Sequence, residues 1–564
     1  MAEKDNNNDE LFTGEVLDVA TTKPWLKFYA GVEESIEYPD VTLYERLMQT
    51  VERYPDEVAW EFTVGGKKAT YREFAHLIDG FADALAGHGF KKGDIMTISM
   101  PTSPQGIIPV YAVNKLGGIA SMIHPLSPPP QIKMYLNISE SNWAYTLDAF
   151  YHPFNEILDE TSVDKLILCK MGDFLGPLWK FLFWLARGRK IKKVPQDDRV
   201  IWYKDMVNKS FPAAPKADIS TDDTAIILYS GGTTGIPKGI ELSSKNLIAE
   251  GMQVGKWGNL SPGNSILAIL PIFHGFGLGV CVNAAFMVGG KSYLIPTFTP
   301  KDVAKLVNKK KPNFLVGVPT LFEALASDPT FQQADLSCLT ATFSGADTLP
   351  RKTKDKFEKV VVDAGGKVQL LEGYGLTEAV TACMATPMND YREGSIGIPF
   401  PDMLAKICKT GTTEEAPCGE VGEICISGPD VMKGYLNNPE ATANTLKKHG
   451  DDRIWLHTGD MGKMDKDGWF YFQLRLKRML KVSGVNVYPN HVEEVLRKHP
   501  DIEDVCIIGV PDKKQVTRVK AMVILKDESK KTEDMKDEIK KYARENLLKW
   551  ESPREIEFRD ELPV

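Results

Sequence analysis

The sequence predicts an α/β protein with a large N-terminal domain of stacked α/β subdomains and a small, mobile α+β C-terminal domain. Three observations lead to this prediction. From about residue 41 onward, segments with the helical period alternate with short apolar segments, which is typical of helices packed on largely parallel sheets. The length of 564 residues exceeds what one hydrophobic core usually serves. Finally, residues 475–564 carry helix and strand patterns of their own.

The elements of the large domain can be placed in chain order. Residues 1–40 are predicted to be a polar tail and lead-in, and we expect the Asn-rich start to be disordered. A first helix opens at Leu43–Met48, and a second at Tyr71–Gly87 carries Phe74, Leu77, Phe81 and Leu85 on one face. Short strands are predicted at Ile95–Met100, Leu166–Cys169, Thr224–Leu228, Ser265–Leu270, Phe314–Val318 and Lys367–Leu371.

The pattern changes near Phe472–Arg478, where we place a hinge between residues 41–474 and 475–564. The C-terminal segment predicts two helices and two strands, at Pro489–Lys498, Val505–Val510, Lys520–Lys526 and Thr532–Leu548. Ninety residues are enough for a small α+β domain.

Composition excludes several function classes. The net charge of −8 argues against nucleic acid as a partner, which would require a basic face. The eight cysteines are scattered without metal-ligand spacing, so neither a zinc site nor a disulfide framework is indicated. Met1–Glu10 lacks the features of a signal peptide, and no apolar run approaches the roughly 20 residues that span a bilayer. These observations predict a cytoplasmic protein.

One segment, Phe174 to Lys193, has two readings of equal weight. Its apolar part contains two tryptophans and three phenylalanines and is followed at once by a dense basic cluster. Such a segment suits a peripheral contact with a membrane surface, where rings lie at headgroup depth and cations meet anionic lipid. It also suits a buried helix with a solvated charged end.

The most informative segment is Tyr229–Gly239, which follows the apolar run Ala225–Leu228. A glycine-rich loop after a buried strand presents N–H groups to an anion, and hydroxyls and a lysine add donors and charge. It is not a Walker A motif, because Lys238 lies between Pro237 and Gly239. Taken alone, such a loop is equally typical of a surface turn. The expected phosphate-binding residues are Ser230, Gly231, Gly232, Thr233, Thr234, Gly235 and Lys238.

The segment resembles the phosphate loop of the adenylate-forming superfamily, which includes acyl-CoA synthetases, firefly-type luciferases and peptide-synthetase adenylation domains. Further segments resemble other motifs of that superfamily in the same order, and together they cover roughly residues 41 to 564. These segments are Leu270–Gly277, Phe343–Asp347, Leu371–Glu378, Trp455–Asp460 and Arg475–Gly484. Two departures from the superfamily pattern occur here: Leu474, just before the last segment, replaces a usual glycine, and Arg478 within it replaces the usual hinge aspartate or lysine.

The resemblance implies a role for each matching residue. Thr234, Lys238, His274 and Glu378 would be catalytic, and Glu378 would hold Mg²⁺. Tyr374 would stack on adenine beside Gly373, Gly375 and Thr377, with Gly345 and Ala346 on the opposite side. Asp460 and Arg475 would bind the ribose hydroxyls. Ser483 and Gly484 would border the channel for the pantetheine arm of coenzyme A.

The implied reaction joins a carboxylate to ATP, with Mg²⁺, and coenzyme A then displaces AMP to give a thioester. We expect a fatty acid substrate, because Gly275, Gly277, Gly279 and Gly317 remove side-chain volume and suggest an apolar tunnel. Alternatives are an aryl-acid CoA ligase, a fatty acyl-AMP ligase and, from another class, a non-catalytic adenylate or acyl-CoA sensor. A homodimer is a further expectation.

The final segment, Ser552–Val564, resembles the approach to the superfamily's last motif and stops before its Gly-Lys pair. That lysine would stabilise negative charge during attack on the α-phosphorus. We therefore expect either a truncated sequence or an impaired first half-reaction, and the agreement up to Glu561–Pro563 favours truncation.

Overall fold

The computed structural model describes residues 11–186, 188–230, 237–475, 480–482, 485–487, 489–512, 516–547 and 551–562. The chain divides into two compact units. The smaller unit is Met1–Pro24, Ala405–Cys425 and His457–Val564, and the larger unit is Trp25–Leu404 and Ile426–Leu456. The predicted fold class is confirmed, since helices and sheets alternate in a large N-terminal domain and a small α+β domain follows. Among the described residues, no helix is both long and apolar enough to cross a membrane.

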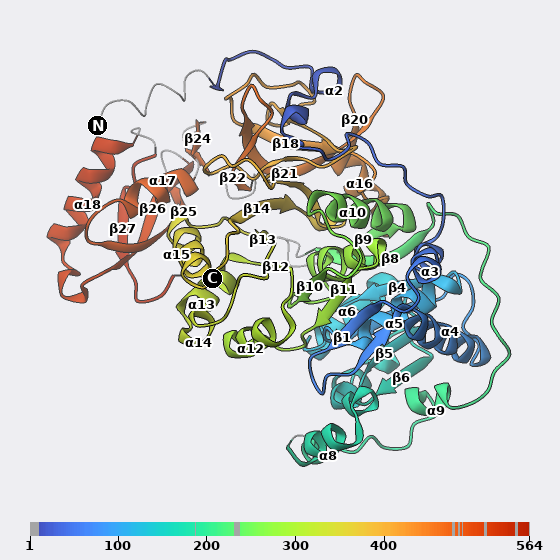
Figure 1. Ribbon diagram of the computed structural model, residues 1–564. Helices are drawn as coiled ribbons and strands as arrows, with labels where there is room; N and C mark the ends of the chain where they lie inside the picture. The colour runs from blue at the N-terminus through green and yellow to red at the C-terminus, as the bar shows by residue number, and fades with distance from the viewer. Residues whose placement is uncertain are drawn as a thin grey trace. The chain divides into compact units, whose positions relative to one another are not determined.

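The larger unit contains a nine-stranded sheet in the order β16-β15-β14-β13-β12-β10-β11-β1-β2 (Figure 1). Its six central strands, β14 to β1 in this order, run parallel, and antiparallel strands close both edges. The bounds are β1 Val58–Phe62, β2 Lys68–Thr70, β10 Ser265–Ala268, β11 Lys291–Leu294, β12 Phe314–Gly317, β13 Ala341–Ser344, β14 Leu370–Gly375, β15 Ala382–Ala385 and β16 Ile398–Pro399. The strand expected at Lys367 begins only at Leu370, after the turn at Gly365.

A second sheet has eight strands in the order β19-β9-β8-β4-β3-β5-β6-β7. Strands β8 to β7 in this order run parallel, whereas β9 and β19 are antiparallel additions at one edge. The bounds are β3 Ile95–Ser99, β4 Ile119–Met122, β5 Trp143–Leu147, β6 Lys165–Cys169, β7 Val200–Trp202, β8 Thr224–Ser230, β9 Lys238–Ser243 and β19 Gly434–Tyr435. These strands are short and apolar because helices cover parallel sheets on both faces.

Several helices of the larger unit begin at residues that cap them. Thr42 with Glu45, Thr70 with Glu73 and Ser243 with Asn246 exchange reciprocal side-chain-to-backbone hydrogen bonds at the starts of α3, α4 and α10. The longer helices are α3 Leu43–Arg53, α4 Tyr71–Gly87, α5 Pro104–Lys115, α6 Pro129–Ser139, α8 Pro177–Ala186, α10 Ser244–Trp257, α12 Pro300–Lys310, α13 Pro319–Ser327 and α15 Arg351–Asp363. The bounds of α4 are those predicted, although Ile78 rather than Leu77 is buried.

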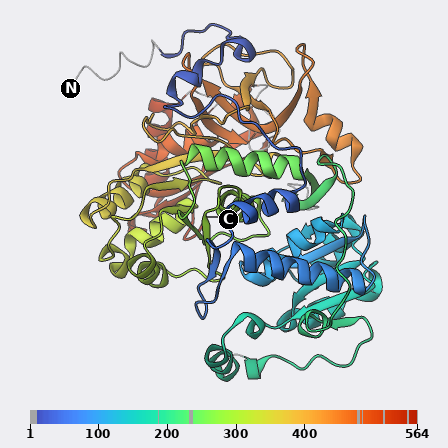
Figure 2. The same cartoon turned by 45° about the vertical axis from the view of Figure 1, so that its right-hand side comes forward.

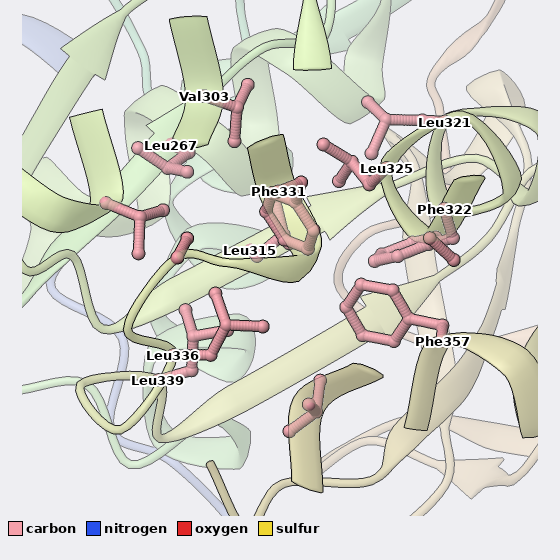
Figure 3. Packing of buried hydrophobic residues seen from close by; sticks show 14 of the residues in the cluster. Leu267, Val303, Leu315, Leu321, Phe322, Leu325, Phe331, Leu336, Leu339 and Phe357 are labelled. Carbon is pink, nitrogen blue, oxygen red and sulfur yellow. The ribbon is translucent and has the colours of Figure 1, made fainter. Parts of the chain in front are cut away.

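One face of the nine-stranded sheet is covered by α12, α13 and α15, and the side chains between them form a continuous core (Figure 3). Phe357 of α15 is fully buried, and its ring lies 4.9 Å from that of Phe322 and 6.3 Å from that of Phe331. Leu267 and Leu315 contribute from the sheet. This core fixes the strands whose ends carry the predicted motifs.

The smaller unit holds the small α+β body predicted for the C-terminus. β25 Ile502–Asp512, β26 Val516–Leu525 and β27 Glu555–Phe558 form one sheet, packed with α17 Pro489–Arg497 and α18 Glu533–Asn546 around an apolar core. The unit also contains β17 Leu404–Cys408, β18 Gly422–Ser427, β21 Ile454–Met464 and β22 Phe470–Arg475 for most of their lengths. Residues 11–40 are more than a polar lead-in, because Val19, Trp25 and Ile36 are buried.

We predict that Phe357→Ala will lower the free energy of unfolding by about 3–5 kcal/mol, since it removes a fully buried ring from a packed core. Urea unfolding followed by circular dichroism measures the change. Val362→Ala is the matched control, because Val362 lies on the same helix and is 66% exposed. A loss for Phe357→Ala no larger than that of the control would contradict the packing described.

Candidate active site

Three of the predicted motifs meet at one edge of the nine-stranded sheet. Because β10, β12, β13 and β14 are parallel, the segments that follow them emerge at the same edge, where α/β proteins bind ligands. The N–H of Gly345 donates to the carbonyl of Gly317 at 3.0 Å. A Cβ atom on Gly345 would lie 3.1 Å from the carbonyl oxygen of Gly373. The two segments expected on opposite sides of adenine are therefore direct neighbours, and Ala346 follows with a φ of +69°.

Tyr374 lies in β14 and is buried, flanked by the two glycines of its motif. A Cβ atom on Gly375 would lie 1.3 Å from the carbonyl oxygen of Thr381, so only glycine fits there. The close approach that this glycine permits is made by the chain itself, at the start of β15. Packing against Thr381 therefore explains this glycine, and its place beside the adenine stays a prediction.

Glu378 stands next to a strained turn. It lies in the short 3₁₀ segment Thr377–Ala379, and Val380 follows with φ 58° and ψ −64°. The N–H of Thr381 donates to the carbonyl of Ala379 at 2.5 Å, which completes a tight γ-turn. A β-branched residue at positive φ is a rare conformation that the surrounding structure must enforce.

The strained turn places its backbone against the acyl-site motif. A Cβ atom on Gly275 would lie 2.0 Å from the carbonyl oxygen of Val380 and 2.6 Å from Oγ1 of Thr381. Gly275 therefore lets the segment after β10 dock against the segment that carries Glu378. The two motifs, a hundred residues apart in the sequence, are held in register by this contact.

His274 precedes this glycine and is exposed, so it is not the satisfied core residue that an apolar run would suggest. Its Nδ1 accepts a hydrogen bond from the N–H of Phe276 at 3.2 Å. Although part of the side chain reaches solvent, protein atoms near the ring partly desolvate it and so lower the pKa of His274. Because Nδ1 accepts the hydrogen bond from Phe276, the neutral form of the ring carries its proton on Nε2.

The predicted tunnel does not arise from the four glycines on which it was based. The missing side chains of Gly275, Gly277 and Gly279 would overlap the carbonyl of Val380, the carbonyl of Pro271 and the carboxyl group of Glu250. That of Gly317 would press against Leu321. Protein atoms fill these spaces, so the glycines serve close packing around the π-helical segment Phe276–Asn283.

The predicted phosphate loop connects β8 to β9 as a hairpin in the second sheet. β8 is buried from Ala225 to Leu228, as expected, and Ser230 pairs with Lys238 at the mouth of the hairpin. The predicted residues Gly231, Gly232, Thr233, Thr234 and Gly235 lie outside the described residues, as do Ser483, Gly484 and Arg478.

Tyr435 connects this hairpin to Glu378 and was missed in the sequence. It belongs to β19, which pairs with β9 so that Tyr435 faces Ile240 in the ladder. Nζ of Lys238 lies 4.2 Å from the centroid of the Tyr435 ring, within the range of a cation–π interaction. The Tyr435 hydroxyl donates to Oε1 of Glu378 at 2.9 Å.

Lys238, Tyr435 and Glu378 form a triplet in which the donor and the acceptor of the hydrogen bond are defined. Burial, and next the charge of Glu378, raise the pKa of Tyr435, so the phenol stays protonated and acts as a donor. The backbone strengthens the link, because the N–H of Met432 donates to the carbonyl of Glu378 at 2.8 Å. A cation and a carboxylate predicted to serve the same phosphates are thereby joined through one aromatic side chain.

The smaller unit contains the predicted ribose pair. Asp460 and Arg475 face each other across β21 and β22, and Nε of Arg475 lies 3.2 Å from Oδ1 of Asp460. The preceding turn is braced by Glu423, whose Oε1 accepts from the N–H of Gly459 at 2.9 Å and whose Oε2 lies 2.7 Å from Nδ1 of His457. Gly459 needs its φ of +71° to make this turn.

Glu423, His457 and Cys425 are all buried, and their potential ligand atoms lie within 4.8 Å of one another. Sequence spacing gave no sign of this cluster, because the three side chains come from two strands. Each carboxylate oxygen of Glu423 already has a hydrogen-bond partner, Oε2 in His457 and Oε1 in the N–H of Gly459. We therefore assign the cluster to positioning Asp460.

The chain matches known proteins over most of its length. A family model described as AMP-binding enzyme matches residues 47–436, and one described as AMP-binding enzyme C-terminal domain matches residues 491–564. A long-chain-fatty-acid–CoA ligase of Bacillus subtilis (strain 168) is 34% identical over 549 residues, which cover 96% of this chain and 95% of that protein. One of Escherichia coli O157:H7 is 34% identical over 555 residues, with the same coverage. ATP-bound MatB from Rhodopseudomonas palustris shares the fold, with a TM-score of 0.79 at 24% identity over 93% of this chain and 96% of that one.

We predict that Gly275→Ala will destabilise the protein by about 1–3 kcal/mol, because the new methyl group would overlap the Val380 carbonyl in a strained turn. The thermal unfolding midpoint reports the loss. Gly80→Ala is the matched control, since Gly80 lies in α4 with no atom near its missing Cβ, and alanine favours helix there. Equal midpoints for the two variants would show that the motifs do not dock as described.

Proposed function

The chain belongs to the family of AMP-binding enzymes, and we propose that it is an AMP-forming fatty-acid–CoA ligase. In the first step a fatty acid carboxylate attacks the α-phosphorus of ATP, which gives an acyl-adenylate and releases pyrophosphate. In the second, the thiol of coenzyme A attacks the acyl carbon and AMP leaves. The observation that carries the proposal is the Lys238–Tyr435–Glu378 triplet beside the adenine motif.

The residues of the larger unit divide the work of the first step. Lys238 and the hairpin loop with Thr234 would bind the phosphates as charge and hydroxyl donors. Tyr374 would stack on the adenine, and Gly345 and Ala346 would lie on the opposite side of the base. Thr377 would donate a hydrogen bond to a phosphate oxygen. His274 would lie near the reacting carboxylate. A neutral imidazole there can donate a hydrogen bond from Nε2 and does not compete with Lys238, because it carries no positive charge of its own.

The residues present fit a magnesium ion. A carboxylate oxygen is a hard donor of the kind that Mg²⁺ prefers, and Tyr435 holds Oε1 of Glu378 so that the carboxylate has one orientation. When bound, Mg²⁺ would neutralise phosphate charge. Glu378 is thus proposed as the metal ligand from the protein.

The remaining proposed roles are the binding of the ribose of ATP and of coenzyme A. Asp460 would accept from the ribose hydroxyls and Arg475 would hold that carboxylate in place. Ser483 and Gly484 would border the pantetheine channel in the second step. We place the domain boundary at 474/475, with a mobile C-terminal domain, and retain the homodimer as a prediction.

The substrate class follows from the curated relatives, whose names specify long-chain fatty acids. The test is AMP release from purified protein with ATP and Mg²⁺, across fatty acids of several lengths and aryl acids, with coenzyme A present or omitted. We expect AMP release that requires both a fatty acid and coenzyme A. Preference for aryl acids, acyl-adenylate that accumulates regardless of coenzyme A, or binding without turnover would favour the aryl-acid ligase, the acyl-AMP ligase or the sensor instead.

We predict that Glu378→Gln will remove the gain in ATP affinity that Mg²⁺ provides, by about tenfold or more, because the amide lacks the charge that holds a divalent cation. Calorimetric titration of ATP with and without Mg²⁺ measures it independently of turnover. Glu440→Gln is the matched control, since Glu440 is exposed in the nearby helix α16 (Pro439–Thr445). An undiminished Mg²⁺ effect in Glu378→Gln would remove this residue from the metal site.

A further inference from the structure

Helix α8, Pro177–Ala186, exposes apolar side chains on nearly its whole circumference. Among the described residues, ten large hydrophobic side chains are exposed, and six of them lie on this one helix. They are Leu178, Trp179, Phe181, Leu182, Trp184 and Leu185, with exposures between 42% and 67%. No residue of α8 is buried, whereas a helix that is apolar all round is normally covered by protein or lipid.

The helix is nevertheless fixed to the body of the larger unit. Phe174 and Leu175, just before it, are buried, so the apolar segment singled out in the sequence begins with anchors rather than exposed residues. The Trp179 side chain lies against the turn at Gly65, 3.3 Å from where a Cβ atom would stand. Phe181 and Trp184 stack with their ring centroids 6.2 Å apart. The apolar surface is therefore presented by a seated helix.

A basic cluster follows the helix directly. Residues 174–196 contain six lysines and arginines and no acidic residue, although the whole chain carries a net charge of −8. Arg189, Lys190, Lys192 and Lys193 are all exposed, and none joins an ion pair among the residues that the structure describes. The positive charge of this cluster is thus available to an anionic surface.

We propose that α8 and the basic cluster dock the protein onto an anionic lipid bilayer, with α8 lying in the headgroup region. Aromatic and leucine side chains are stabilised when they are buried at that depth, and lysines beside them are attracted to anionic headgroups. Ten residues of helix measure about 15 Å, which is too short to cross about 30 Å of hydrocarbon.

A second copy of the chain is a poorer occupant for the same surface. Symmetric pairing would bring two basic clusters together, and like charges without counter-charges oppose association. A stable protein interface also needs roughly 800 Å² from each partner with matching shape, and a single short helix provides little of that. A bilayer requires no shape match.

The position of α8 separates docking from the nucleotide chemistry. The helix lies in the connection between β6 and β7, at one edge of the eight-stranded sheet, whereas the phosphate hairpin lies at the other (Figure 1). Six strand spacings from β9 to β7 amount to about 29 Å. Both views place α8 at the far end of its unit from β9 (Figure 2). Docking can therefore be tested without ATP or coenzyme A, independently of the proposed ligase function.

The experiment is flotation of the full chain with vesicles of phosphatidylcholine alone or with about 30% phosphatidylglycerol. We expect at least tenfold stronger partition to the anionic vesicles, weakened when the salt concentration rises to about 0.5 M. Phe181→Ser with Trp184→Ser should lower partition tenfold or more by removing the stacked pair. Lys190→Glu with Lys192→Glu should lower it similarly, and only on anionic vesicles.

Two matched variants control for general effects. Lys301→Glu with Lys309→Glu makes the same charge change at exposed lysines of α12, and Val362→Ser with Ile454→Ser removes exposed apolar side chains elsewhere. Both should float like the wild type, and circular dichroism verifies folding of all variants. The proposal is overturned if the wild type binds neither vesicle, or if the α8 variant and the basic-cluster variant both bind like the wild type. It is also overturned if the α8 variant changes only the oligomeric state, measured by size-exclusion chromatography, and not the partition to vesicles.

Discussion

The contact on which the candidate site depends is the hydrogen bond from Tyr435 to Glu378, made beneath the ammonium group of Lys238. Lys238 and Glu378 come from different sheets, since the phosphate hairpin belongs to the eight-stranded sheet and Glu378 follows β14 of the nine-stranded sheet. Tyr435 reaches both because β19 pairs with β9 and because Met432, just before it, binds the backbone of Glu378. One aromatic residue thus sets the distance between the cation and the carboxylate that we propose to serve one triphosphate.

The second constraint is close backbone packing at the carboxyl edge of the nine-stranded sheet. The carbonyl oxygen of Thr381 packs where a side chain on Gly375 would stand, and that of Val380 packs in the same way against Gly275. The positive φ of Val380 is held by the tight turn around it. Strain of this kind costs on the order of 1–3 kcal/mol and persists only where the surroundings enforce it. Here the core formed by Phe322, Phe331 and Phe357 supplies that rigidity behind the strands. The site is therefore built on packed elements, with its strain next to the proposed metal ligand.

Local patterns in the sequence predicted much of this arrangement. The strand before the phosphate loop, the bounds of α4 and the helices and strands of the C-terminal body follow from periodicity that tertiary contacts did not override. Tyr435 could not be found in this way, because its role comes from pairing between strands almost 200 residues apart. The tunnel argument failed because a missing side chain marks either a void or a close approach, and sequence cannot distinguish them. The exposure of α8 was equally undecidable, since a buried and an interfacial helix share one composition.

The measurement that tests the central claim most directly is the affinity of Tyr435→Phe for ATP, with and without Mg²⁺. Phenylalanine keeps the ring beneath Lys238 and removes only the hydroxyl that orients Glu378. Because a hydrogen bond to a charged group contributes about 1.5–3 kcal/mol, we predict a loss of roughly tenfold or more with Mg²⁺ and little change without it. Unchanged affinity in both conditions, or an equal loss in both, would contradict the claim that Tyr435 connects the phosphate lysine to the metal ligand.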